Sequence, residues 1–309
     1  MTIRVIKPGL STTVQDRGRY GFAHLGISPA GAADTVLLRI ANLLAGNDEY
    51  APLLEMTLLG PTLSFDEPAV VVLGGASCEC KLGADEVPAN QAIEVPAGSV
   101  LQCGSTTNGA RSYLAVQGGF DVPLVMGSAS TDVRGRFGGF EGRRLQSGDV
   151  LKIRPDVTRR VRRLRVGAME GVRSSGPLRV TKGAQHDWFS AEMFSRFLSS
   201  PYAVSEQSDR AGLRLRGEPV SPLGKKQLLT DGIPLGAIQV PQDGQPIILF
   251  VDQQTTGGYP KIANVIAADM HRVGQLRPRD EVRFADVSTA EAVEALRAQE
   301  RWLQGIFAT

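Results

Sequence analysis

The segment 236–261, GAIQVPQDGQPIILFVDQQTTGGYPK, concentrates polar groups on both sides of a short apolar run. Its glutamine amides offer paired donors and acceptors that suit an amide, a urea or a carboxylate. Its threonines and paired glycines can present hydroxyls and backbone N–H groups to an anion. We predict a substrate-binding set of Gln239, Gln254, Thr256, Gly257, Gly258 and Tyr259, with Lys261 in a catalytic role. The alternative is a polar β-hairpin whose glycines only make the turn.

A second candidate is the adjacent pair Asp209 and Arg210. A guanidinium can bind a carboxylate through two parallel hydrogen bonds, and an aspartate beside it can orient a neighbouring group. We therefore predict that Arg210 and Asp209 act together with Lys261 in catalysis. The alternative is a structural Asp–Arg pair that holds a turn. The pair Asp16 and Arg17 in the first half of the chain has the same two interpretations.

Motifs for metals and nucleotides are weak or missing. The histidines, His24, His186 and His271, are far apart in sequence, and a C-x-C pair at Cys78 and Cys80 has no second pair to complete a zinc signature. We predict no metal and interpret the cysteines as core thiols. The sequence contains no P-loop, no G-x-S-x-G turn and no dinucleotide fingerprint. ATP, if it is consumed, is bound by a partner protein or at a site without a standard motif.

Short apolar runs that end in glycine predict the elements that carry these residues. The 35 glycines and 18 prolines lie between such runs, which indicates a mainly β protein rich in turns. Predicted strands cover residues 69–73, 112–116, 150–153, 247–251 and 282–284, and predicted helices cover 34–44, 187–198 and 288–302.

A weak internal repeat indicates two related domains. Four landmarks occur in the same order in both halves, beginning with the segments around Asp16 and Asp209. We predict a first β domain over residues 1–155, an arginine-rich linker over 156–177, and a second β domain with a C-terminal helix over 178–309. The linker is either a solvated connection or a docking surface for an acidic partner.

Composition excludes several classes of partner. A net charge of +2 gives no global signal for nucleic acid or a membrane surface, and no run of apolar residues is long enough to span a bilayer. Three cysteines in 309 residues favour a reducing compartment. We expect a cytoplasmic protein that binds neither nucleic acid nor membranes.

Several runs of the sequence carry a family resemblance. They include VIKPGLSTTVQDRGRYGFAHLGISPAGAAD (5–34), RSYLAVQGGFDVP (111–123), GFEGRRLQSGD (139–149), QSDRAGLRLRG (207–217) and the segment 236–266. Together they resemble the biotin-dependent carboxyltransferase, KipA and allophanate hydrolase subunit 2 family. The resemblance implies a mainly β fold with two cyclophilin-like β-barrel domains and a few short helices, which agrees with the repeat.

The resemblance also implies partners and a substrate class. Many stand-alone members resemble the C subunit of ATP-dependent 5-oxoprolinase, which opens 5-oxoproline to glutamate together with two other subunits, one of the LamB/YcsF type and one KipI-like. We therefore expect a small lactam or amide substrate and ATP used by the assembled complex. Two alternatives are a carboxyltransferase or allophanate hydrolase component of urea metabolism and a non-catalytic KipA-type regulator that binds a KipI-like protein. The chain has no A-M-K-M-type segment, so it carries no biotin of its own.

Overall fold

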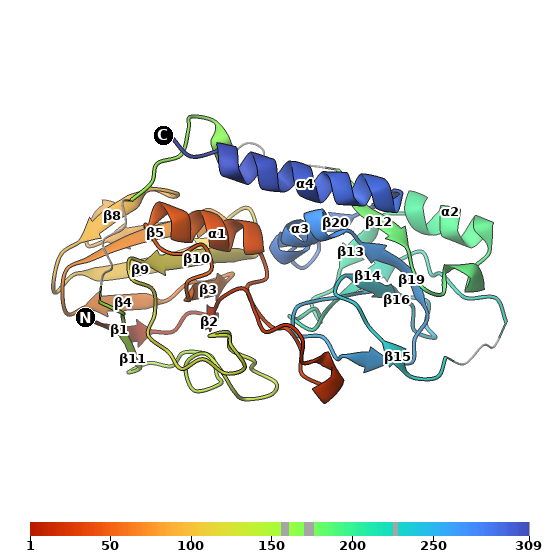
Figure 1. The fold of residues 1–309 in the computed structure, drawn as a ribbon, viewed down its shortest axis with the longest axis horizontal. Helices are drawn as coiled ribbons and strands as arrows, with labels where there is room; N and C mark the ends of the chain where they lie inside the picture. Colours follow the sequence, from red (N-terminus) through yellow and green to blue (C-terminus); the bar gives the residue numbers. More distant parts are fainter. Residues whose placement is uncertain (156–160, 170–175, 225–227, 309) are drawn as a thin grey trace. The chain divides into compact units, whose positions relative to one another are not determined.

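The computed structural model describes residues 1–155, 161–169, 176–224 and 228–308, and most of its regular structure is β (Figure 1). The chain divides into two compact units. The first comprises Met1–Tyr20, Ala30–Glu170 and Leu303–Thr309, and the second comprises Gly21–Pro29 and Gly171–Trp302. The predicted mainly β fold with few helices is confirmed.

Two antiparallel sheets build the first unit. One has the order β11-β1-β4-β9-β6-β7, formed by Val150–Lys152, Thr2–Lys7, Thr62–Phe65, Val100–Thr106, Cys78–Leu82 and Asp85–Glu86. The other has the order β2-β3-β10-β5-β8, formed by Ser11–Gln15, Leu53–Thr57, Arg111–Val116, Ala69–Gly75 and Ala92–Val95. One apolar cluster contains residues of both sheets, for example Ile3, Leu101, Val71 and Leu114. Burial of this shared apolar surface is therefore the main force that holds the two sheets together.

Helix α1 (Thr35–Leu44) packs on β5 and β10 (Figure 1). It begins where the sequence predicts, because Oδ1 of Asp34 accepts a hydrogen bond of 2.9 Å from the backbone N–H of Leu37. An aspartate in this position satisfies one of the N–H groups that the first helical turn leaves without a partner. The apolar face of the helix, including Leu38 and Ile40, is fully buried.

A single eight-stranded sheet dominates the second unit. Its order is β20-β13-β14-β17-β16-β19-β12-β21, formed by Glu281–Val282, Tyr202–Val204, Gly212–Gly217, Ile247–Leu249, Ala237–Gln239, Lys261–Val265, Leu178–Lys182 and Phe284–Asp286. A separate two-stranded sheet pairs β15 (Asp231–Gly232) with β18 (Thr256–Gly257). The unit also contains the 3-10 turns Ala23–Leu25, His186–Trp188 and Ala267–Asp269, and the helices α2 (Ala191–Ser199) and α3 (Met270–Gln275).

The helix predicted over 187–198 is shorter than expected. A 3-10 turn at His186–Trp188 comes first, and Phe189 is extended. Helix α2 then starts behind Ser190, whose Oγ accepts from the N–H of Met193 at 3.1 Å. Helix α4 (Thr289–Gly305), predicted over 288–302, begins with a reciprocal cap between Ser288 and Glu291.

The two units share some features of the predicted duplication and differ in others. Oδ1 of Asp16 accepts from the N–H of Gly18 at 2.8 Å, and Oδ1 of Asp209 accepts from the N–H of Ala211 at 2.8 Å, so the same turn occurs at the first landmark. The first unit has two large sheets, whereas the second has one. The duplication stays a prediction. The predicted linker lies partly on residues 156–160 and 170–175, outside the described residues.

Among the helices in the described ranges, none combines the length and the apolar character that crossing a membrane requires.

Candidate functional site

Lys261 stands at the start of β19, and its side chain is buried. The residue is 2 % exposed, and Nζ lies 2.8 Å from Oδ2 of Asp231 on β15. Its backbone N–H donates to Oε1 of Gln185 at 3.2 Å, and the side chain of Gln185 also hydrogen-bonds to Asp231. The ammonium of Lys261 and the backbone N–H of Gly232 hold the pKa of Asp231 below its ordinary value of 3.8. The carboxylate of Asp231 is therefore ionised at neutral pH.

A glycine makes room for this arrangement at the end of β12. A Cβ at Gly183 would collide with the carbonyl oxygen of Lys261 and come within 2.7 Å of the backbone nitrogen of Ala263. The backbone N–H of Gly183 also bonds to the carbonyl of Ile262 at 3.0 Å. Gly183 therefore lets the segment that carries Gln185 approach β19 closely enough for Gln185 to reach Lys261.

Two predicted glutamines converge on Gly257. Gln239 pairs with Lys261 between β16 and β19, next to a register shift, and is 2 % exposed. A Cβ added to Gly257 would lie 3.0 Å from Nε2 of Gln239 and 3.6 Å from Nε2 of Gln254. Nε2 of Gln239 also donates to the carbonyl of Tyr259 at 3.5 Å. Two amide groups thus approach the backbone at a residue that has no side chain to block them.

The two-stranded sheet joins this group to Asp231. Asp231 is opposite Gly257, and Thr256 is opposite Gly232. Tyr259 is 46 % exposed, so its ring is accessible to solvent. A Cβ added to Gly258 would lie 3.3 Å from the carbonyl oxygen of Leu228, so the backbones of these two residues are close together.

The structure therefore brings most of the predicted set together. We call the group formed by Gln185, Asp231, Gln239, Gln254, Gly257, Tyr259 and Lys261 the Lys261 cluster. Sequence reasoning missed Gln185 and Asp231. The signal for Asp231 was its place directly before the segment 232–237, which resembles residues 26–32 of the first half.

Arg210 and Asp209 have other contacts. Nε and Nη2 of Arg210 donate to the two carboxylate oxygens of Asp252 at 2.8 Å and 3.0 Å. The Arg210 side chain is 14 % exposed and that of Asp252 is 4 % exposed. Oδ1 of Asp209 accepts from the backbone N–H groups of Ala211 and Gly212 at 2.8 Å and 3.1 Å. These bonds tie Arg210 to the residues after β17 and Asp209 to the turn before β14.

The chemistry open to the Lys261 cluster is the binding of an oxygen-rich polar group. A buried ammonium and amide N–H donors stabilise a carboxylate or a carbonyl oxygen that gains negative charge. The carboxylate of Asp231, 2.8 Å from Nζ, holds the ammonium in place. Within the described ranges, no group of three or more His, Cys, Asp or Glu residues is placed to hold a metal ion.

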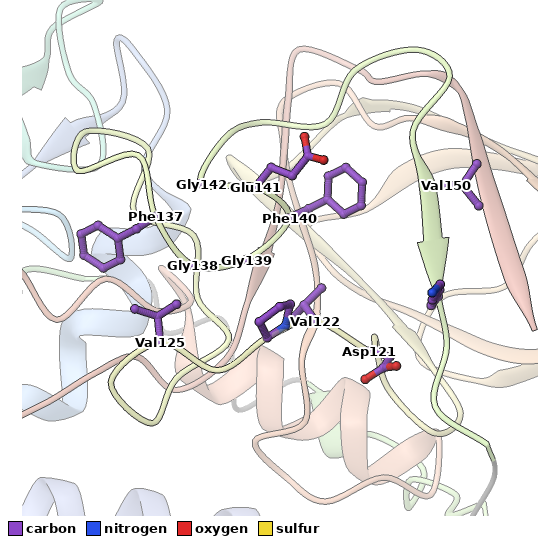
Figure 2. Close-up of a pocket in the computed structure, with 12 residues that line it drawn as sticks. Asp121, Val122, Val125, Phe137, Gly138, Gly139, Phe140, Glu141, Gly142 and Val150 are labelled. Atoms are coloured by element: carbon purple, nitrogen blue, oxygen red, sulfur yellow. The ribbon is translucent and has the colours of Figure 1, made fainter.

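A pocket of about 410 Å³ lies in the first unit (Figure 2). Its walls combine apolar side chains, such as Val122, Phe137 and Phe140, with the carboxylates of Asp121 and Glu141. Gly138 and Gly139 lie between Phe137 and Phe140 in Figure 2. None of the predicted site residues lines this pocket. Several residues that line this pocket belong to the run 139–149. In the sequence, this run indicated the family resemblance but no pocket.

Comparison with known proteins identifies the family. Residues 25–286 match the carboxyltransferase domain, subdomain A and B, and the chain belongs to this family. It is 41 % identical over 305 residues to the 5-oxoprolinase C subunit of Escherichia coli, and the match covers 98 % of this chain and 96 % of that protein. The 5-oxoprolinase C subunit of Haemophilus influenzae is 37 % identical over 294 residues, covering 95 % and 94 %. The predicted resemblance is confirmed.

A solved structure of a much larger protein also contains this fold. The K. lactis urea amidolyase superposes with a TM-score of 0.90 at 31 % identity. The match covers 98 % of this chain and 20 % of that protein. The whole fold of this chain therefore has a counterpart within one fifth of the urea amidolyase.

Proposed function

We propose that this chain is the C subunit of an ATP-dependent 5-oxoprolinase, which opens the lactam ring of 5-oxoproline to give glutamate. One observation carries the proposal: the similarity to the E. coli protein extends over 98 % of this chain and 96 % of that protein. The two chains therefore correspond over nearly all of their lengths, whereas the match to the urea amidolyase covers only 20 % of that protein. We place the enzyme in the cytoplasm, assembled from this chain, a LamB/YcsF-type protein and a KipI-like protein.

The Lys261 cluster fits the functional groups of 5-oxoproline. The substrate has a carboxylate, a lactam carbonyl and one N–H group. The buried ammonium of Lys261 suits an anionic oxygen, and the side-chain amide of Gln239 suits the lactam edge. Asp231 and Gln185 hold the lysine in position through their contacts with its Nζ and backbone N–H. In this proposal ATP is bound and used by the assembled complex, since the chain has no nucleotide motif of its own.

Reconstitution of the three proteins tests this proposal. ATP- and 5-oxoproline-dependent release of glutamate is the expected result, with no release when any of the three is omitted. Lys261→Met should lower kcat/KM by at least about tenfold, the value of one charge-assisted contact to a bound ligand. Lys182→Met is a matched control, because Lys182 is an exposed lysine on the neighbouring strand β12. Unchanged turnover in both Lys261→Met and Gln239→Leu would place the substrate elsewhere in the complex.

A carboxyltransferase role in urea metabolism is the second candidate. The TM-score of 0.90 to the K. lactis urea amidolyase supports it. Carboxyl transfer to urea from an added biotinylated carrier, without glutamate release from 5-oxoproline, would favour this candidate. A stable complex with the KipI-like chain that turns over neither substrate would instead favour a regulatory role. Size-exclusion chromatography of the co-expressed chains at micromolar concentration tests whether that complex forms.

A further inference from the structure

Three cysteines meet in the first unit, far from the Lys261 cluster in sequence. Cys78 and Cys80 lie on β6, separated by Glu79, and their sulfur atoms are 2.9 Å apart. A register shift between Cys78 and Cys80 accompanies this close approach. Cys103 on β9 is directly opposite Cys80, and their thiols are hydrogen-bonded. All three are free thiols.

The three sulfurs differ in their access to solvent. Cys80 is 4 % exposed and Cys103 is 5 % exposed, whereas Cys78 is only partly buried. The hydrogen bond with Cys80, together with burial, raises the pKa of the Cys78 thiol far above its ordinary value. The hydrogen bond with Cys103 likewise raises the pKa of the Cys80 thiol. A small molecule that arrives from solvent therefore meets a protonated thiol at Cys78 first.

We propose that Cys78 and Cys80 form an oxidation site that closes to a disulfide after the Cys78 sulfur attacks a small peroxide. The sulfurs are 2.9 Å apart, and a disulfide bond is about 2.05 Å long, so a shift of about 1 Å brings them to bonding distance. Strands with alternating side chains place residues i and i+2 on the same face, which makes the C-x-C spacing suitable for this pairing. Cys103 holds the Cys80 thiol in place but is not needed for the bond.

The chemistry proceeds in two balanced steps. The Cys78 sulfur attacks one oxygen of hydrogen peroxide, the O–O bond breaks, and water leaves with the thiol proton, which gives a sulfenic acid. The Cys80 sulfur then attacks the Cys78 sulfur, the S–O bond breaks, and the departing oxygen takes the Cys80 proton to leave as a second water. Two thiols and one peroxide thus give one disulfide and two waters. Added dithiothreitol reverses the reaction by thiol–disulfide exchange.

The raised pKa values set the pH dependence of the reaction. Only the thiolate is a strong nucleophile, and a raised pKa means that its fraction is small at neutral pH. The rate of disulfide formation should therefore rise about tenfold for each pH unit from about pH 7 to pH 9. An ordinary exposed cysteine, with a pKa of about 8.5, would level off within this range.

Peptide mapping of the full-length chain treated with hydrogen peroxide tests the proposal. Cleavage after Glu79 should leave two fragments joined by the disulfide and separable by dithiothreitol. Cys103→Ser should keep the reaction. Cys78→Ser removes one partner of the bond, and the remaining thiols of Cys80 and Cys103 are buried, so any disulfide in this variant should form at least about tenfold more slowly. Thermal unfolding of each variant confirms that it is folded. Three outcomes would overturn the proposal: conversion of Cys78 to a sulfinic acid without a disulfide, loss of the disulfide in Cys103→Ser, or a Cys80–Cys103 disulfide in Cys78→Ser that forms as fast as the disulfide of the wild type.

Discussion

Lys261 and Asp231 form an ion pair of 2.8 Å in which only the lysine is buried. The side chain of Lys261 is 3 % exposed, whereas that of Asp231 is 50 % exposed. The two partners are therefore not equivalent. Removing the carboxylate leaves an ammonium with little access to water, and removing the ammonium leaves a carboxylate that water can solvate.

The first prediction follows from this difference. Asp231→Asn should lower the free energy of unfolding more than Lys261→Met does, although the second change removes the charge that is central to the site. Urea denaturation of the two variants measures both values. Glu206→Gln is the control, because Glu206 pairs with Arg279 at the surface, where both side chains are mostly exposed, and it should change stability very little. A larger loss in Lys261→Met than in Asp231→Asn would contradict the prediction.

The second prediction concerns Arg210 and Asp252. Arg210→Ala leaves the Asp252 carboxylate, which is 4 % exposed, without the guanidinium that binds both of its oxygens. We expect this change to lower the free energy of unfolding by about 3–5 kcal/mol. Arg210→Lys should recover only part of this loss, because an ammonium cannot form the two parallel hydrogen bonds that a planar guanidinium makes with a carboxylate. The double variant Arg210→Met with Asp252→Leu should regain most of it. Equal stability of Arg210→Ala and the wild type would show that the pair has no structural role.

The Arg210 result also determines how a loss of activity should be interpreted. Lower turnover in Arg210→Ala could come from partial unfolding of the second unit rather than from a missing anion contact. Turnover therefore has to be measured well below the unfolding temperature of the variant. Lys261→Met gives the cleaner test of the site, since the first prediction expects it to lose less stability than Asp231→Asn, and the carboxylate that it leaves is accessible to water.

Local patterns in the sequence predict much of the fold. The apolar run 69–73 before Gly74-Gly75 became β5, and the run 112–116 became β10, because buried strands are continuous and apolar. The cap at Asp34 and the reciprocal cap at Ser288 and Glu291 were also predictable, since each depends on residues within one turn.

The missed part of the site depends on contacts distant in sequence. Gln185 is 76 residues from Lys261, and Asp231 is 30 residues from it. Their approach depends on the pairing of β12 with β19, on the room left at Gly183, and on a register shift at Gln239. A one-residue change of register would turn these side chains to the opposite face, and local composition carries no information on this choice.

The third prediction is a pH dependence at Asp269. This carboxylate is 1 % exposed and accepts hydrogen bonds from Arg179 and Arg272. Burial alone raises the pKa of Asp269, but the hydrogen bonds from Arg179 and the charge of Arg272 outweigh it and hold the pKa below its ordinary value of 3.8. A lowered pKa in the folded state means that the ionised carboxylate stabilises the fold above about pH 4, and that this contribution disappears as pH falls through the folded-state pKa.

Asp269→Asn removes that contribution. The difference in unfolding free energy between the wild type and Asp269→Asn should be greatest above about pH 5 and should shrink steadily as the pH falls below about 4. Urea denaturation at a series of pH values measures it. Asp243→Asn is the control, because Asp243 is an exposed carboxylate of the same unit, and its difference should stay near zero throughout. If the difference in unfolding free energy between the wild type and Asp269→Asn does not change with pH, the ionised carboxylate of Asp269 does not stabilise the fold as predicted.

The fourth prediction compares the related turns at Asp16 and Asp209. Asp16 is 6 % exposed, and its carboxylate accepts from Ser128 Oγ at 2.6 Å, from Ser130 Oγ at 2.5 Å, and from the backbone N–H groups of Gly18 and Ala129 at 2.8 Å and 2.7 Å. The carboxylate of Asp209 is exposed and holds only two backbone N–H groups. Asp16 therefore connects its turn to the segment 128–130, whereas Asp209 supports only its own turn.

Replacing each aspartate by alanine should separate these roles. Asp16→Ala leaves several buried donors without an acceptor, so it should lower the free energy of unfolding by at least about 3 kcal/mol. Asp209→Ala should lower it by only about 0.5–1.5 kcal/mol, because water can reach the N–H groups that it frees. Urea denaturation followed by circular dichroism measures both. Asp16→Asn should recover little, since one oxygen becomes an amide group that cannot accept a hydrogen bond. Equal losses in the two alanine variants would mean that the contacts of Asp16 with the segment 128–130 add nothing to stability.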